Sequence, residues 1–406
     1  MRKYWKSTAI ITVIVLSIGA FYVNSAMSAT QYPAFVIKKQ SGNVEEIKSL
    51  VLEGGYYEGN SLNYTYTHLK INSDGSEYRE GSSLIEQLIG QPSPFIKEMQ
   101  ETYRDFMRGK GQNIDSFFEN DQFLAYADVK YKFNVSESSD FKFAISIFDK
   151  DNGNTASYNI KVPDSSVVDH IFVEDVQMVD NELKMITSNT IRENDKYYND
   201  KHIYTINVSN GKIISNEVIF SIPDSQEELQ SDAQLIQTDP KQANEHLVFL
   251  KTESKFIPQE ESDRIDVLSK KLVSYNLKTK EINTIELSEN LKDKQVSFFD
   301  GSTIYFTEFS EQKLVVTPLS IENNQAGSEF TIQLSNASSN EEPPIIIVKG
   351  SKLYAINQIL NLKTKASVAV VNVKTGETLY EGEVVRKNTP ESMEEFELFI
   401  YQMSVK

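Results

Sequence analysis

The sequence predicts an all-β domain that follows one N-terminal transmembrane helix and carries a small helical insertion. Three features indicate this fold class. Most of the 406 residues fall into short runs in which apolar and polar residues alternate, and turn-forming residues separate these runs. The chain also holds 20 Tyr and 22 Phe, residues whose rings pack well on a pleated, half-buried surface. A basic stretch followed by an apolar one stands at the N-terminus and is typical of an export signal.

The apolar N-terminal run is predicted to be a signal anchor that stays in the membrane. It covers residues 7–23 and includes the aromatic pair Phe21 and Tyr22, which is typical of a membrane interface. No Lys or Arg follows it before Lys38. This asymmetry places the N-terminus in the cytoplasm and the remainder of the chain outside. Three basic residues precede the run: Arg2, Lys3 and Lys6.

These features divide the chain at about residue 29. Residues 1–29 are predicted to form a cytoplasmic stub and the transmembrane helix of a single-pass cell-membrane protein. Residues 30–406 are predicted to form an extracytoplasmic domain. Small residues at Ala26 and Ser28 also fit a signal-peptidase site before Ala29, so cleavage is the alternative to a retained anchor. Both outcomes leave the domain outside the cytoplasm.

Charge and cysteine content exclude several classes of function. The formal net charge is −17, which repels phosphate backbones, so nucleic acid is not an expected partner. Within residues 30–406 the densest basic stretch is predicted around Lys278 and Lys280, where acids are interleaved. Cysteine is absent, which excludes disulfides, a lipoprotein anchor and thiolate metal sites. An exported chain of this size without cysteine is typical of Gram-positive-type bacteria.

Four hairpins are predicted along the domain. In each of them an alternating strand leads into a turn and a second strand returns. The last three share an Asn just before a turn that is rich in Lys, Thr, Asn and Gly. Further strands are predicted over residues 183–188, 246–252, 303–309, 313–319 and 352–356. The hairpins join residues 141–147 to 157–162, 203–208 to 213–220, 272–277 to 282–287, and 368–373 to 378–385.

Two of these hairpins resemble the outer hairpins of β-propeller blades of the PQQ-like or WD40-like kind. They read Tyr204-x-Ile-Asn-Val-Ser-Asn-Gly-Lys and Ala369-x-Val-Asn-Val-Lys-Thr-Gly-Glu. The spacing of the turns is also close to a blade length. The resemblance covers three or four short segments from about Phe141 onwards, and most glycines and tryptophans of the strict families are missing. It implies a β-propeller-like domain over residues 30–406 and brings no ligand with it.

The C-terminal strand bears on how such a domain would close. Propellers close when a strand from one end of the chain joins the blade formed by the other end. Residues 396–401 are predicted to complete a blade begun by residues 62–71. The alternative is a plain terminal strand on an open sheet.

A helical insertion over about residues 82–118 interrupts the strands. Ser93 and Pro94 are an N-cap and a first helical residue, and a shorter helix is predicted before them around residues 84–89. The apolar stripe of the main helix is interpreted as a partner-docking surface. The alternative is that this stripe closes one end of the core. Six residues at three- and four-residue spacing form the stripe: Phe95, Ile96, Met99, Tyr103, Phe106 and Met107.

The sequence offers no catalytic, metal or cofactor motif. Ser209 begins a literal Ser-x-x-Lys match, but it lies in a predicted hairpin turn rather than on a helix. Residues 149–154 resemble a calcium loop, yet Gly153 is fifth and Ile160 stands where the bidentate Glu is required. A tight turn is therefore predicted there, with weak calcium binding as the alternative. The histidines have no ligand spacing: His68, His170, His202 and His246.

The leading hypothesis is a membrane-anchored, extracytoplasmic binding or accessory/sensor protein with no catalytic site and no cofactor. Residues 1–6 form a cytoplasmic tail that is too short to signal alone, so a membrane or envelope protein partner is expected. The alternative is a hydrolase or lyase of a cell-envelope polysaccharide, using carboxylates in a central channel. The 58 acidic residues permit such a pair but nominate none. A third hypothesis is an inert adhesion or spacer domain.

Overall fold

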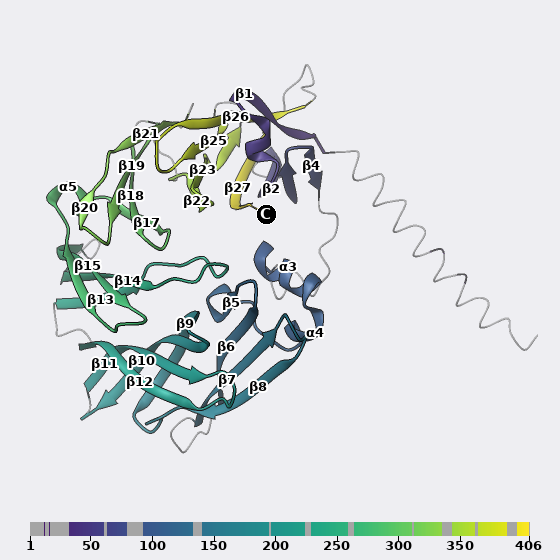
Figure 1. The fold of residues 1–406 in the computed structure, drawn as a ribbon. Coiled ribbons are helices and arrows are strands. Elements are labelled where there is room, and N and C mark those ends of the chain that lie inside the picture. Colours follow the sequence, from purple (N-terminus) through teal and green to yellow (C-terminus); the bar gives the residue numbers. More distant parts are fainter. Residues whose placement is uncertain are drawn as a thin grey trace, which may run out of the picture. The chain divides into compact units, whose positions relative to one another are not determined.

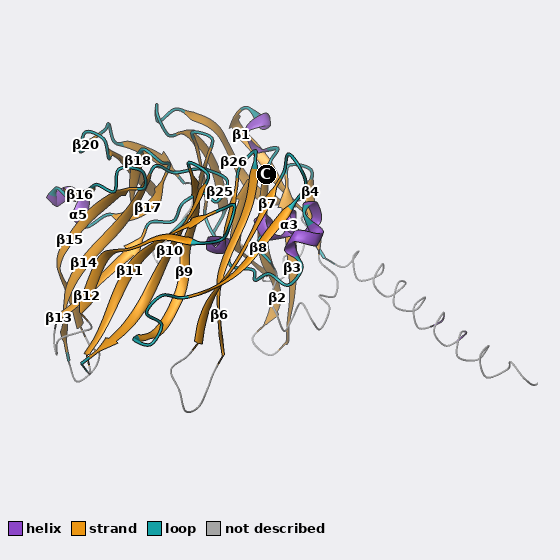
Figure 2. Ribbon diagram, turned by 60° about the horizontal axis from the view of Figure 1, so that its bottom comes forward, coloured by secondary structure: helices purple, strands orange, loops and turns teal. Residues whose placement is uncertain are grey.

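The computed structural model is all-β, with a few short helices (Figures 1 and 2). It divides into two compact units, which are described separately below. Unit 1 comprises Met1–Gln91, Glu308–Val316 and Glu329–Lys406, and unit 2 comprises Pro92–Thr307 and Thr317–Ser328. The structure describes Thr12, Leu16 and residues 32–60, 63–78, 92–132, 140–194, 196–223, 229–258, 264–310, 312–334, 343–361, 364–387 and 396–405.

Two sequence predictions fall on other parts of the chain. Apart from Thr12 and Leu16, the predicted anchor over residues 1–29 lies outside the described residues. The short helix predicted around residues 84–89 also lies outside them. Among the residues that the structure describes, no helix is long and apolar enough to cross a membrane.

Unit 1 contains two antiparallel sheets, and each combines strands from both ends of the chain. One has the strand order β1-β26-β25-β23-β22 and the other β24-β27-β2-β3-β4. The strands are β1 (Phe35–Gly42), β2 (Leu50–Asn60), β3 (Asn63–Asn72), β4 (Gly75–Tyr78), β22 (Ile345–Lys349), β23 (Lys352–Ile356), β24 (Ile359–Asn361), β25 (Ala366–Asn372), β26 (Thr378–Arg386) and β27 (Phe396–Val405), and a 3₁₀ turn, η1 (Val44–Ile47), follows β1.

The pairing of chain ends confirms one prediction and refines it. Strand β27 lies in the same sheet as β3, as expected for residues 396–401 and 62–71, but its direct neighbour is β2. In that ladder Tyr56 is opposite Leu398. Strand β1 pairs with β26, with Phe35 opposite Arg386, a pairing that the sequence did not predict. One core lies between the two sheets and includes the fully buried Tyr56 and Tyr380.

Unit 2 contains three four-stranded antiparallel sheets, each built from consecutive strands. Their orders are β5-β6-β7-β8, β12-β11-β10-β9 and β13-β14-β15-β16. The strands are β5 (Phe117–Glu119), β6 (Phe123–Lys132), β7 (Asp140–Asp149), β8 (Thr155–Lys161), β9 (Val168–Val179), β10 (Glu182–Glu193), β11 (Lys196–Asn207), β12 (Ile213–Pro223), β13 (Leu229–Leu235), β14 (His246–Ile257), β15 (Arg264–Asn276) and β16 (Ile282–Glu286).

A sixth sheet among the described residues has the order β17-β18-β19-β20, with β21 paired to β19. The short helix α5 precedes it along the chain. The elements are α5 (Glu289–Lys292), β17 (Gln295–Phe299), β18 (Thr303–Ser310), β19 (Lys313–Ser320), β20 (Gln325–Ala326) and β21 (Phe330–Gln333).

The four predicted hairpins are confirmed as antiparallel pairs, and their turns share one hydrogen-bonding pattern. The side-chain oxygen of Asn207 accepts hydrogen bonds from two backbone N–H groups of its turn, and Asn276 and Asn372 do the same. Asp149 plays this part in the turn that was compared with a calcium loop. Such turns are favoured when a polar side chain accepts hydrogen bonds from the backbone N–H groups two and three residues further along the chain. These Asn and Asp residues therefore specify where each strand reverses.

The described part of the helical insertion lies in unit 2, and its main helix begins where the sequence predicts. It consists of α3 (Pro94–Thr102), α4 (Arg104–Met107) and the 3₁₀ turn η2 (Ile114–Ser116). Ser93 caps α3, since its Oγ accepts a hydrogen bond from the N–H of Ile96 at 3.3 Å. The helix ends at Tyr103, whose backbone no longer has helical angles.

Candidate functional site

The predicted docking stripe is largely buried within unit 2. Ile96 and Met99 are 0% and 1% exposed, and Phe106 and Met107 are 6% exposed each. They pack against Phe117, Leu124 and Tyr126 of strands β5 and β6, and Phe95 and Tyr103 are partly buried against the same cluster. These contacts agree with the alternative interpretation, in which the stripe closes one end of the core. The face that α3 leaves exposed is polar and consists of Lys97, Glu98, Gln100, Glu101 and Thr102.

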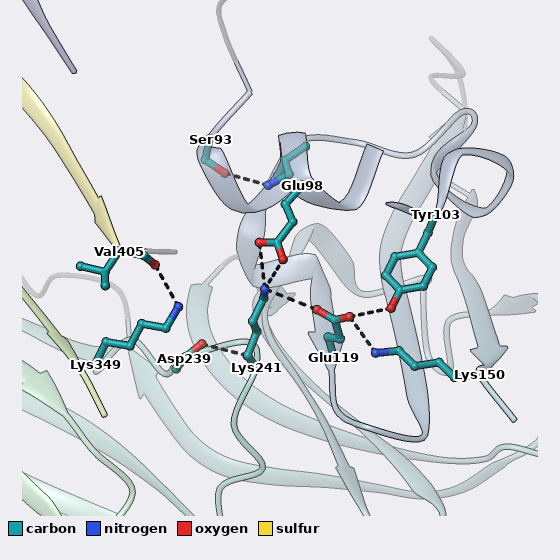
Figure 3. Close-up of polar contacts among 10 residues, drawn as sticks. Ser93, Glu98, Tyr103, Glu119, Lys150, Asp239, Lys241, Lys349 and Val405 are labelled. Atoms are coloured by element: carbon teal, nitrogen blue, oxygen red, sulfur yellow. Dashed lines mark hydrogen bonds and ion pairs between the residues drawn. The ribbon is translucent and has the colours of Figure 1, made fainter. Parts of the chain in front are cut away.

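A chain of polar contacts holds α3 and α4 against the rest of unit 2 (Figure 3). The carboxylate of Glu119 in β5 accepts hydrogen bonds from the Tyr103 hydroxyl at 3.0 Å and from the Lys150 ammonium at 2.7 Å. Lys241 lies 2.8 Å from Glu98 and 3.8 Å from Glu119. Since Glu119 is only 9% exposed, its charge is balanced by these cations within the protein.

A surface hollow of about 740 Å³ lies beside α4, over one face of the β6-β7-β8 sheet. Tyr126 stands opposite Ser146, and Ser146 stands opposite Ser157, so all three share this face. Helix α4 covers the end of the face near Tyr126, where Phe106 packs. The uncovered part presents small side chains, of which Ala144 is one.

The ionisable side chains around the hollow are mostly basic. Asp105 is the single carboxylate among its lining residues, and it lies 3.4 Å from Arg108. This contrasts with the net charge of −17 for the whole chain. Four cationic side chains line the hollow: Arg104, Arg108, Lys110 and Lys130.

Lys110 is the most constrained of these cations. Its ammonium donates a hydrogen bond to the carbonyl of Phe106 and lies 3.8 Å from the centroid of that ring. Burial lowers the pKa of Lys110, and the nearby charge of Lys130 lowers it further. Both effects disfavour the charged ammonium, and the negative charge of a bound anion would favour it.

Sequence reasoning missed this group of cations for a physical reason. The sequence directed attention to Lys278 and Lys280, whereas the cations around the hollow come from α4, the turn after it, and β6. Three basic residues between positions 104 and 110 were a signal in so acidic a chain. Lys130 joins them only through the strand register, which places it opposite Lys142 and on the same face as Ala144.

Two carboxylates of β9, the half-buried Glu174 and the buried Asp175, are engaged by internal partners. Burial raises the pKa of Glu174, although the Lys201 ammonium lies 2.5 Å from its Oε1. Burial also raises the pKa of Asp175 to about 7, against hydrogen bonds donated by Gln177 at 3.0 Å and Thr238 at 3.1 Å. Thr238 precedes β14, so Asp175 connects β9 to the neighbouring sheet.

The histidines and the calcium-like loop have partners of other kinds. His68 hydrogen-bonds to the hydroxyls of Tyr66 and Tyr401, and His202 to the side chain of Asn216. One oxygen of Asp149 accepts backbone N–H groups of its own turn, and the other accepts the side-chain amide of Asn152. Among the described residues, no group of three or more His, Asp or Glu is arranged to hold a metal ion.

Comparison with known proteins assigns the chain to no family. No protein-family model matches the chain, and no curated protein matches it in sequence. A variant of the apocarotenoid oxygenase of Synechocystis is 8% identical, with a TM-score of 0.41 over 92% of this chain and 95% of that one. TolB from Acinetobacter baumannii is 10% identical, with a TM-score of 0.31 over 82% of this chain and 64% of that one. An acylaminoacyl peptidase from Pyrococcus horikoshii is 9% identical, with a TM-score of 0.32 over 64% and 38%. Likenesses this low carry no argument about fold or activity.

Proposed function

We propose that this chain is a membrane-anchored, extracytoplasmic binding protein that serves as an accessory or sensor subunit in the cell envelope. The observation that carries the proposal is the hollow beside α4, which gathers four cations on a chain of net charge −17. A local charge opposite to that of the whole molecule selects partners that the remaining surface repels. The membrane location rests on the N-terminal basic and apolar stretches.

The binding surface of this proposal consists of the polar face of α3 and the hollow. Because four of the six apolar side chains of the predicted docking stripe are buried, the side chains available to a partner are those on the opposite face. Glu119 accepts a hydrogen bond from Tyr103 at the end of the helix, and Lys241 lies 3.8 Å from Glu119, so the helix is held in place. A surface that is fixed before binding loses less entropy when a partner arrives.

We further propose that the six sheets are blades of a β-propeller-like domain. Support comes from the order of the strands, since three sheets of unit 2 each consist of four strands that are consecutive in the chain. Support also comes from unit 1, where β1 joins β26 and β27 joins β2. Pairing between the first and last strands of a chain is how propellers complete a blade.

Photocrosslinking in native membranes tests the binding function. A photocrosslinking residue is introduced into the full-length chain at Gln100 on α3 or at Thr155 in the hollow, with Glu281 on the β15–β16 turn as the control position. We expect one reproducible adduct from the first two positions and none from the third. Equal capture at all three positions, or none at any, would contradict the proposal.

A further inference from the structure

The hollow beside α4 contains two cations for which the described residues provide no ion pair. Within the described part of the chain, neither Arg104 nor Lys130 has an ion-pair partner, although both line the hollow. Across the ladder from Lys130, Lys142 lies 3.1 Å from Asp140 and is therefore paired. Arg104 and Lys130 therefore line the hollow without a described ion pair, although Asp128 lies on the same face of β6 as Lys130 and accepts a hydrogen bond from Tyr126 at 2.9 Å. Cations that are not engaged in ion pairs favour an anionic ligand.

The remaining lining residues indicate what else the ligand carries. Thr155, Ser157 and Asn159 of β8 line the hollow with exposed hydrogen-bonding side chains. Ser146 shares a hydrogen bond with Ser157 at 3.1 Å, and each hydroxyl retains further capacity to donate or accept. Such a row of short polar groups suits a ligand with several hydroxyls.

An aromatic side chain at the rim adds apolar surface. Tyr103 lines the hollow, and its hydroxyl donates a hydrogen bond to Glu119 at 3.0 Å. Its ring is therefore held in a fixed orientation. A fixed ring beside hydrogen-bonding groups gives a ligand both apolar and polar contacts.

From these contacts we propose that the hollow binds an acidic saccharide, a sugar unit that bears a carboxylate or a phosphate. Arg104, Lys110 and Lys130 bind the anionic group, and the Ser146–Ser157 row binds the hydroxyls. A volume of about 740 Å³ is in the range of small-molecule sites and exceeds what one inorganic anion fills. The proposal rests on the binding function proposed above and names its ligand class.

Titration of the full-length protein in detergent with defined saccharides tests the ligand class. The probes are tetragalacturonate, which carries carboxylates, and a phosphorylated mannose tetrasaccharide, with maltotetraose as the neutral control. We expect one or both acidic probes to bind and maltotetraose to bind at least tenfold more weakly, because charge-assisted hydrogen bonds are the strong ones. The acidic probe that binds more tightly identifies the anionic group. Affinity should fall as salt is raised, because exposed charges are screened.

Charge-removing variants locate the site. Lys130→Gln and Arg104→Gln are exposed changes that should each weaken acidic-probe binding by about tenfold. Lys110→Gln should do the same, and thermal unfolding of each variant shows whether the fold is kept. The matched control is Lys278→Gln, which removes an equal charge from the exposed β15–β16 turn and should leave affinity unchanged.

Three outcomes would overturn the ligand class: no binding of either acidic probe, equal binding of maltotetraose, or equal loss of affinity in Lys278→Gln. Each is separable from failure of the binding function, which the photocrosslinking at Gln100 and Thr155 measures without any added saccharide. Adducts at those positions together with no saccharide binding would overturn the ligand and leave the binding function standing. Failure of both experiments would overturn both.

Discussion

The Lys241 ammonium lies 2.8 Å from the Glu98 carboxylate, although the two residues are 143 positions apart in the sequence. This contact ties helix α3 to the turn that precedes β14. The same ammonium lies 3.8 Å from the buried Glu119, so it balances two acids at once. The helix is thereby attached to two separate sheets of unit 2.

Lys241→Met should loosen α3 more than it destabilises the protein. Glu98 is 54% exposed, and ion pairs of this kind contribute about 1 kcal/mol or less to the free energy of unfolding. We expect a small fall in melting temperature and clearly faster hydrogen exchange of the amides of α3. The control is Lys97→Met, which removes a cation 3.8 Å from Glu101 within the same helix. Equal exchange rates in the two variants would show that Lys241 does not fasten the helix.

Met99→Ala tests whether the apolar stripe of α3 belongs to the core. Met99 is 1% exposed, so truncation should lower the free energy of unfolding by about 2–5 kcal/mol. Gln100→Ala, at the neighbouring exposed position, should change it by less than about 0.5 kcal/mol. Denaturant unfolding of the full-length protein measures both. If Met99→Ala left stability unchanged while abolishing crosslinked adducts, the stripe would be a docking surface after all.

The hairpins could be predicted because their signals are local. Alternation sets which face of a strand is buried, and an Asn before the turn sets where the strand reverses. The turn after Asn276 shows how strong the second signal is. Lys280 adopts a φ of +65° there, where the equivalent residues of two other hairpins are Gly211 and Gly376. The two hydrogen bonds that Asn276 accepts from backbone N–H groups stabilise the turn, even though a lysine takes the positive φ there.

The candidate site could not be predicted because it depends on non-local pairing. Whether Lys130 faces the hollow or the core is decided by the register of β6 on β7, and a slip of one residue would reverse it. The burial of Met99 and Phe106 depends likewise on a sheet whose strands follow the helices in the sequence. A stripe of apolar residues on a helix shows that one face is covered, but it does not show by what.

Two glycines with the same backbone conformation should respond differently to alanine. Gly153 and Gly211 have φ of +72° and +67°, a region in which a side chain costs about 1–2 kcal/mol. A Cβ at Gly153 would meet nothing within 4 Å, so Gly153→Ala should cost only that amount. A Cβ at Gly211 would lie 2.2 Å from the ring of Tyr158.

The Gly211→Ala variant should therefore cost more, by about 1–3 kcal/mol. The ring of Tyr158 would have to move, and its hydroxyl would lose the hydrogen bond to the carbonyl of Val208, now 2.8 Å. Melting temperatures of the two variants, measured side by side, provide the test. Equal losses would mean that the β8 strand yields to the added methyl group without strain.

Asp175 should make stability depend on pH in an unusual direction. Burial raises its pKa to about 7 in the folded chain, whereas an unfolded Asp has a pKa of about 3.9. Between these values the folded chain keeps a proton that the unfolded chain has lost. The free energy of unfolding therefore falls as pH rises from about 4 to 7, by up to about 1.4 kcal/mol for each pH unit from this group.

Asp175→Asn should remove this dependence. The amide still offers an oxygen to Thr238, and it carries no charge to be buried at high pH. Burial also raises the pKa values of Glu174 and Asp115, so the wild-type protein and the variant keep a shared background slope. The measurement is denaturant unfolding at pH 5, 6, 7 and 8, with the exposed Asp121→Asn as a charge-matched control. The stability of Asp175→Asn relative to the wild type should rise with pH and that of the control should not. A difference that stays constant across the four pH values would mean that Asp175 does not hold its proton in the folded chain.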